Sequence, residues 1–237
     1  MRRKNFLAAA ATIAAAAGSA CAKGNADQLE AVEPASQFDF AAFRKLVDKP
    51  SDVRQVWDAS GYQPQILVAI LNALNGYQFG YGIAPGRIST VACLHGFANA
   101  FAYDDWVWEK YKFGELFNAL FGLKDRSGNA VTNNVFAHPR STFDASADPN
   151  DPKGMYQDNS LSTLQRRGVL FFVCHNGAAE QARTLVQSGN AAGMEPSAVL
   201  HDLVTHVIPG AIVVPSAVAT IGLLQNRFRY AYTTVTA

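Results

Sequence analysis

The chain has 237 residues, of which 49% are apolar and 16% are charged, and its formal net charge is +1. A chain of this length and apolar content can bury the core of one sizeable domain. Its charge lacks the strongly basic balance that nucleic-acid binding requires, so the composition argues against a nucleic-acid partner.

The first 22 residues have the pattern of an export signal peptide. MRRKN is followed by the apolar stretch FLAAAATIAAAAG and then by SACAK, which is the charged start, apolar middle and small-residue exit of such signals. Arg2-Arg3 also fits the twin-arginine variant. The apolar stretch is about 13 residues long, which is short of the roughly 20 that a membrane-spanning helix needs. We therefore expect a cleaved signal and a periplasmic protein. Cys21 lacks the preceding aliphatic residue of a lipoprotein signal, which disfavours a lipid anchor.

The next elements are predicted from hydrophobic periodicity. Residues 23–52 are interpreted as a leader segment that ends in a short helix, FDFAAFRKLV, stopped by Pro50. The domain proper, 53–237, then begins with a strand, VRQVWDA. The apolar run from Ile66 is too long for a strand and predicts a buried helix. RISTVACLHG at 87–96 predicts a second strand, and GELFNALFGL predicts a further helix.

Residues 124–160 differ in composition from the rest of the chain. They are dense in Asp, Asn, Ser, Pro and Gly and contain few aliphatic residues. Loops of this length inside a compact domain are uncommon, and they serve either as lids over a site or as surface extensions. We expect one long surface loop insertion here, and both roles remain open.

Strands and helices alternate again after residue 160. The predicted order is helix LSTLQRR, strand GVLFFVC, helix AAEQARTLVQSG, helix PSAVLHDLVTHV, strand AIVVP, helix SAVATIGLLQN and strand FRYAYTTV. The continuous apolar runs LFFV and IVV are typical of parallel strands that are buried on both faces. The predicted fold is a three-layer α/β domain with a mostly parallel sheet, helices on both faces, and the last strand at an edge.

The stretch GVLFFVCHNGAAE places Cys174 at the end of a buried strand and at the start of a helix. Ligands of open α/β sheets bind beyond the carboxyl ends of the strands. Asn176 or Gly177 is expected to cap the helix, which would leave Cys174 near the positive end of the helix dipole. Such a position favours the reactive thiolate. The alternative, that Cys174 is only a small core residue, also remains open.

Two histidines could assist Cys174. His95 ends the strand at 87–96 and could form a thiolate–imidazole pair with Cys174 if the two strands are neighbours. Its alternative role is to close a tight turn. His175 points away from Cys174 if the extended geometry persists, and it is therefore assigned a helper role at most. Cys93 lies inside an apolar run and is interpreted as a buried residue, with a disulfide to Cys174 as the alternative in an oxidising compartment.

Other motifs carry weaker signals. Trp106 and Trp108 in DDWVWEKY could wall a pocket, or they could form local packing or a subunit contact. His201 and His206 are five residues apart, whereas two metal ligands on one helix face are three or four apart. We therefore predict no metal site. No phosphate-binding glycine loop and no serine nucleophile elbow is found, and no cofactor is predicted.

RRGVLFFVCHNGAAEQA and PGAIVVPSAVATIGLLQNRFRYAY resemble the DsrE/DsrF-like family, whose fold is also called YchN-like. The resemblance includes Cys174 followed by Asn176, the V-P-x-x-V element from Val214, Leu224-Gln225 and the aromatic last strand. It implies a homotrimer or homohexamer, and in sulfur-relay members a persulfide on the cysteine that corresponds to Cys174. The implied partner is a small sulfur compound or a sulfur-donor protein. Gly177 departs from the family, in which threonine often follows the asparagine.

The alternative to sulfur chemistry, from another functional class, is a non-enzymatic ligand-binding or assembly module that uses the same cleft.

Overall fold

The computed structural model describes residues 37–140, 147–154 and 157–235. The predicted signal peptide at 1–22, Cys21 and the first part of the leader lie outside the described residues. None of the helices in the described ranges is long and apolar enough to cross a membrane.

The centre of the fold is a five-stranded parallel sheet with the strand order β4-β3-β2-β1-β5. The strands are β1 (Val53–Ser60), β2 (Ile88–His95), β3 (Leu170–Cys174), β4 (Ile212–Val214) and β5 (Ala231–Thr234). The inner strands β2 and β3 are almost entirely buried, which is why their sequences are continuous apolar runs. β5 is an edge strand, as predicted.

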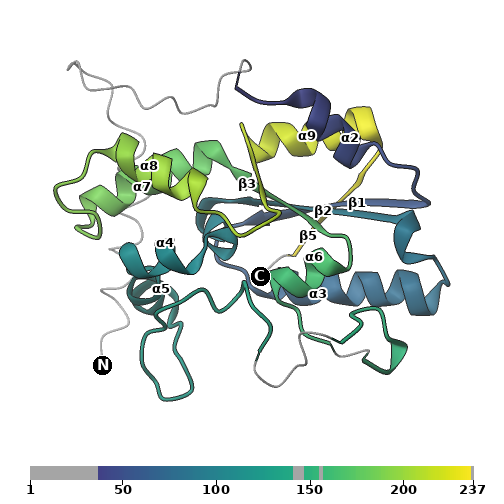
Figure 1. Cartoon of the computed structure of the whole chain (residues 1–237), viewed down its shortest axis with the longest axis horizontal. Coiled ribbons are helices and arrows are strands. Elements are labelled where there is room, and N and C mark those ends of the chain that lie inside the picture. The colour runs from purple at the N-terminus through teal and green to yellow at the C-terminus, as the bar shows by residue number, and fades with distance from the viewer. Residues whose placement is uncertain (1–36, 141–146, 155–156, 236–237) are drawn as a thin grey trace.

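Helices cover both faces of the sheet, which confirms the predicted three-layer α/β architecture (Figure 1). The helices are α2 (Phe40–Val47), α3 (Gln65–Asn75), α4 (Asp105–Lys110), α5 (Phe113–Phe121), α6 (Leu161–Arg166), α7 (His175–Gln187), α8 (Pro196–Thr205) and α9 (Ala217–Phe228). The larger core lies on the face that packs against α3 and α5 to α8. A smaller core lies under α2 and α9 on the opposite face.

The order of the strands explains this division. The chain steps from β1 to β4 across neighbouring strands, and the connecting helices of these steps pack on one face. It then returns to the far side of β1 through α9, which crosses the other face. Because parallel crossovers are right-handed, reversing the direction of travel places the return helix on the opposite face.

α3 ends at Asn75, immediately before Gly76, as predicted, and a separate π-helical turn, Gly76–Gly80, follows it. One local prediction needs correction. α9 extends to Phe228, which was predicted to lie in the last strand. Arg229 in the left-handed conformation ends that helix, and β5 begins only at Ala231. Phe228 is 3% exposed, so its burial under the sheet outweighs its preference for a strand.

The insertion at 124–160 is not purely a surface loop. Asn134 is 1% exposed, and its Nδ2 donates to the carbonyls of Phe101 and Tyr103 at 2.9 and 2.6 Å. Its Oδ1 accepts from the backbone of Phe136 and Ala137. A buried polar side chain therefore anchors this loop to the segment that follows β2. Composition alone could not reveal this, because asparagine is as common in mobile loops as in such anchors.

Candidate functional site at the carboxyl edge of the sheet

Cys174 is the last residue of β3, and its Sγ lies at the N-termini of two helices. Sγ accepts hydrogen bonds from the backbone N–H groups of Gly177 in α7 and Ala217 in α9, both at 3.3 Å. The positive ends of both helix dipoles therefore face one sulfur atom. The residue is only 4% exposed.

The expectation that Asn176 or Gly177 caps α7 is wrong. The helix begins at His175, and Cys174 is the capping residue because its own Sγ accepts the Gly177 N–H. Asn176 lies inside the first turn, where its N–H donates to the carbonyl of Pro215 at 3.4 Å. The Nδ1 atom of His175 and the Oδ1 atom of Asn176 are buried and have no hydrogen-bond partner among the described residues.

Asn99 holds the backbone of Cys174 in place. Its Oδ1 accepts from the Cys174 N–H at 3.1 Å and its Nδ2 donates to the Cys174 carbonyl at 3.0 Å. Asn99 belongs to the 3₁₀ segment η3 (Gly96–Ala102) that follows β2, and it is fully buried. This double contact fixes the direction in which the strand delivers the thiol.

Gly177 is required for the close approach of α7 to η3. A Cβ atom at this position would lie 2.9 Å from Asn99 Nδ2 and 3.3 Å from the backbone nitrogen of Gly96. The side chain of Gln181, one turn further along α7, donates to the Gly96 carbonyl at 2.9 Å. The glycine that departs from the family resemblance is therefore a packing requirement at this contact.

His95 ends β2 and pairs with a carboxylate that the sequence analysis did not single out. Its Nε2 lies 2.7 Å from Oδ1 of Asp58 in β1, and the hydroxyl of Tyr232 in β5 donates to Asp58 Oδ2, also at 2.7 Å. Because a carboxylate only accepts hydrogen bonds, Nε2 is the donor in this contact. The hydrogen bond to Asp58 also raises the pKa of Tyr232.

The sheet brings His95 and Cys174 onto the same face. β2 and β3 are neighbours, and His95 and Cys174 lie one residue beyond their last register pair, Leu94 and Val173. Partners in a parallel register point to the same side of the sheet. The condition that the two strands are neighbours is thus met, but the hydrogen bond of the His95 ring goes to Asp58 and not to the thiol.

Cys93 is a fully buried free thiol on the same face, and it forms no disulfide with Cys174. Burial raises the pKa of the Cys93 thiol, and the charges of Asp58 and Cys174 raise it further. A thiol in this state is inert near neutral pH. Of the two cysteines, only Cys174 has hydrogen-bond donors directed at its sulfur.

The two tryptophans lie away from this site and differ from each other. Trp108 is fully buried, and its Nε1 donates to the Ala100 carbonyl at 2.8 Å, so it is a core residue and not a pocket wall. Trp106 is 41% exposed, lines a hollow between α4, α6 and the chain that follows α8, and stacks on His206 with ring centroids 4.0 Å apart. His206 in turn contacts Asp104 at 3.0 Å.

Sequence reasoning missed Asp58, Asn99, Ala217 and Tyr232 as parts of the site. Asp58 carried a usable signal, because a carboxylate near the carboxyl end of a parallel strand faces the ligand-binding edge. Asn99 gave no signal beyond its position in the alanine-rich stretch GFANAFA, and Ala217 contributes only its backbone N–H.

Within the described ranges, no group of three or more His, Cys, Asp or Glu side chains is arranged to hold a metal ion. Compared with protein-family models, curated proteins and solved structures, the chain has no significant match.

Proposed function

We propose that the protein is a sulfane-sulfur carrier that holds a persulfide on Cys174. The single observation that supports this most is the pair of backbone N–H groups, from Gly177 and Ala217, directed at one sulfur atom. A persulfide anion, like a thiolate, is stabilised by such donors and by the positive ends of two helices. The resemblance of the surrounding motif to DsrE/DsrF-like proteins points to the same chemistry.

The transfer step needs no external oxidant. The Cys174 thiolate attacks the outer sulfur of a hydropersulfide, R–S–SH, and a new S–S bond forms on Cys174. The S–S bond of the donor breaks and R–S⁻ leaves, so that one sulfur moves and no electrons are gained or lost overall. The reverse reaction, with an acceptor thiolate, would return Cys174 to its starting state.

His95 would accept the proton of Cys174 before the attack. Nε2 of its ring contacts Asp58, so Nδ1 would accept this proton, and Asp58 would stabilise the imidazolium that forms. Tyr232 in turn orients Asp58 from the edge strand. We therefore assign His95 a proton-transfer role, and Asp58 and Tyr232 positioning roles.

The low exposure of Cys174 suggests a small donor. A cysteine that is 4% exposed can be reached by inorganic polysulfide or a short hydropersulfide more easily than by a donor presented on a protein surface.

Peptide mass spectrometry after incubation with inorganic polysulfide tests the proposal. Cys174 should gain the mass of one sulfur atom, and dithiothreitol should remove it. Cys93→Ser is the matched control, and it should take up sulfur as the wild type does because the Cys93 thiol is buried and its pKa is raised. A Cys174→Ser variant that takes up as much sulfur as the wild type would overturn the proposal.

Export and self-assembly are also proposals. Export is supported by the signal-like pattern of residues 1–22, and processing would be visible as an N-terminus near Lys23 in cells. A homotrimer or homohexamer is supported by the resemblance of the motif around Cys174 to DsrE/DsrF-like proteins. Light scattering of the purified protein tests this assembly, and a monomer at micromolar concentration would contradict it.

A further inference from the structure

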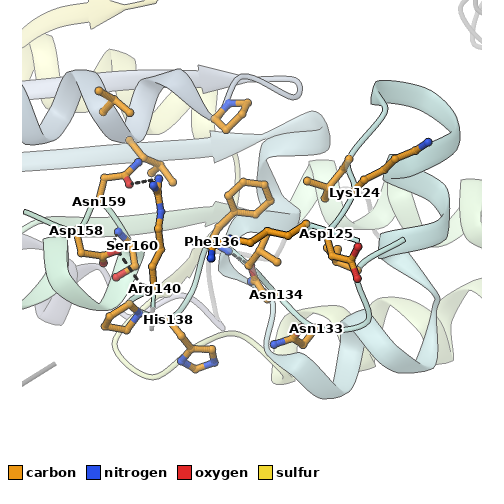
Figure 2. Close-up of a pocket in the computed structure, with 18 of the residues that line it drawn as sticks. Lys124, Asp125, Asn133, Asn134, Phe136, His138, Arg140, Asp158, Asn159 and Ser160 are labelled. Atoms are coloured by element: carbon orange, nitrogen blue, oxygen red, sulfur yellow. Dashed lines mark hydrogen bonds between the residues drawn. The ribbon is translucent and has the colours of Figure 1, made fainter. Parts of the chain in front are cut away.

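A cavity of about 800 Å³ lies between α3 and the insertion, on the opposite face of the sheet from Cys174 (Figure 2). It is bounded by the N-terminus of α3, the chain after α5, and residues 131–140 and 158–160 of the insertion. Because α3 follows β1, the cavity lies beyond the carboxyl end of that strand, where ligands of open α/β sheets bind. Its volume lies within the range of small-molecule sites.

The walls of the cavity combine apolar side chains with firmly held polar ones. Val68 of α3 and Val135 of the insertion are 44% and 41% exposed, and both line the cavity together with Phe136. Asn134 also lines it, and the hydrogen bonds of Asn134 to the core anchor this part of the insertion. The apolar surface is therefore exposed in a hollow that is already formed, not on a flat face.

The charges that line the cavity do not balance. Lys124, Arg126 and Arg140 form no ion pair with any carboxylate among the described residues. The two lining carboxylates accept backbone hydrogen bonds and keep their negative charge. Asp125 accepts from the N–H groups of two residues of its own turn, and Asp158 accepts from those of Arg140 and Ser160. Three cations and two carboxylates therefore give the lining a net charge of +1.

Arg140 is held in position at the cavity wall. Its backbone N–H donates to Asp158 Oδ1 at 3.2 Å, and its guanidinium donates to Asn159 Oδ1 at 3.1 Å. Figure 2 shows this side chain extended along the lining toward Asn159. The bond to Asn159 uses one N–H of the five that a guanidinium carries, which leaves donors for a carboxylate, sulfonate or phosphate group.

We propose that this cavity binds an organic anion, that is, an apolar body carrying one carboxylate, sulfonate or phosphate group. The apolar body would contact Val68, Val135 and Phe136, the anionic group would be bound by Arg140, and Arg126 would add to the positive charge of the lining. This site is separate from Cys174, so it gives the chain a second, ligand-binding function. The insertion, whose role the sequence left open, forms one wall of it.

Fluorescence titration of the full chain with two matched probes tests the proposal. Anilinonaphthalene sulfonate and phenylnaphthylamine share the same aromatic body, and only the first is anionic. We expect one sulfonate probe to bind per chain, at least about tenfold more tightly than the neutral amine. Arg126→Gln with Arg140→Gln should weaken the sulfonate about tenfold and change the amine less than about twofold.

The control variants separate the effect of the arginine charges on probe binding from the effects of apolar contact and of unfolding. Arg227→Gln removes the same charge from α9 on the opposite face and should leave both affinities unchanged. Val68→Gln, on an exposed position of α3, should weaken both probes. Cys174→Ser should bind the sulfonate as the wild type does, which keeps this site independent of the sulfur chemistry. Equal affinity for the two probes, or unchanged sulfonate binding in the folded double arginine variant, would overturn the proposal.

Discussion

The side chain of Asn99 forms two hydrogen bonds with the backbone of Cys174: it accepts from the Cys174 N–H at 3.1 Å and donates to the Cys174 carbonyl at 3.0 Å. Asn99→Ala should therefore leave a buried N–H and a buried carbonyl short of one partner each. We expect a loss of about 2 kcal/mol in the free energy of unfolding, measured by urea denaturation. Sulfur uptake by Cys174 should also slow, because the strand end that directs the thiol loses its support.

Asn226→Ala is the matched control for this change. Asn226 lies exposed on α9, and its side chain bonds only to a carbonyl of its own helix. Its removal should change the free energy of unfolding by less than about 0.5 kcal/mol. If Asn99→Ala is no less stable than Asn226→Ala, the contact with Cys174 does not contribute to stability.

Gly114 of α5 packs directly against the backbone of the insertion. A Cβ atom at Gly114 would lie 1.6 Å from the carbonyl oxygen of Val131, so Gly114→Ala must displace the insertion or the helix. We expect a loss of about 3 kcal/mol in the free energy of unfolding. Gly222→Ala in α9 is the control, because nothing lies within 4 Å of its Cβ position. It should stabilise the protein by about 0.5 to 1 kcal/mol, since alanine favours a helix. Thermal melts of both variants measure the contrast.

The positions of the strands could be predicted well because burial on both faces requires continuous apolar residues. LFFV in β3 follows this rule, and the strand lies where this run was expected. IVV also forms a strand, but β4 lies at an edge of the sheet and only Val214 of it is buried. The insertion was less predictable, because the anchoring of Asn134 depends on carbonyls some 30 residues earlier in the chain, at Phe101 and Tyr103. Local composition contains no information on such a contact.

The candidate site was predicted in part for a similar reason. Cys174 and His95 could be found because each ends an apolar run, and this places both at the carboxyl edge. Asp58 and Tyr232 join them only through the register of β1 with β2 and with β5, which a single sequence does not specify. The cap of α7 was mispredicted because sulfur was not considered as the acceptor for the Gly177 N–H.

Asp202 of α8 gives the stability of the protein a dependence on acid pH. Burial opposes its ionisation, but hydrogen bonds from Lys110 and Tyr111, both at 2.6 Å, and the charge of Lys110 hold the Asp202 pKa below its ordinary value. A carboxylate with a depressed pKa stabilises the folded state above the pKa of the unfolded chain. This stability is lost as the pH falls through the folded pKa, that is, below about 4.

Asp202→Asn should remove this part of the acid dependence. Between about pH 5 and pH 2, the melting temperature of the variant should fall less than that of the wild type, although it starts from a lower value. Glu109→Gln, an exposed carboxylate change on α4, should retain the wild-type profile. Parallel profiles for the wild type and Asp202→Asn would show that this hydrogen-bonded group does not contribute to the acid dependence.

Ala217 is the first residue of α9, so proline can replace it and remove its N–H, but the proline Cδ then takes the place of the hydrogen that points at Cys174 Sγ, and the sulfur must move aside. Proline is favoured at this helical position, and the extended conformation of the preceding residue, Ser216, is compatible with a following proline. Ala217→Pro deletes one of the two donors to Cys174 Sγ. If these donors stabilise the thiolate, alkylation of Cys174 by iodoacetamide at neutral pH should slow about tenfold.

Ser216→Ala is the control that separates helix capping from thiolate stabilisation. Ser216 Oγ accepts from the Ala219 N–H, and this hydrogen bond does not involve the sulfur. Its loss should cost about 1 kcal/mol of stability and leave the alkylation rate of Cys174 unchanged. A folded Ala217→Pro protein that reacts as fast as the wild type would show that the N–H of α9 does not activate Cys174. The Gly177 N–H of α7 would then be the only backbone donor, of the two that contact the sulfur, left to support its reactivity.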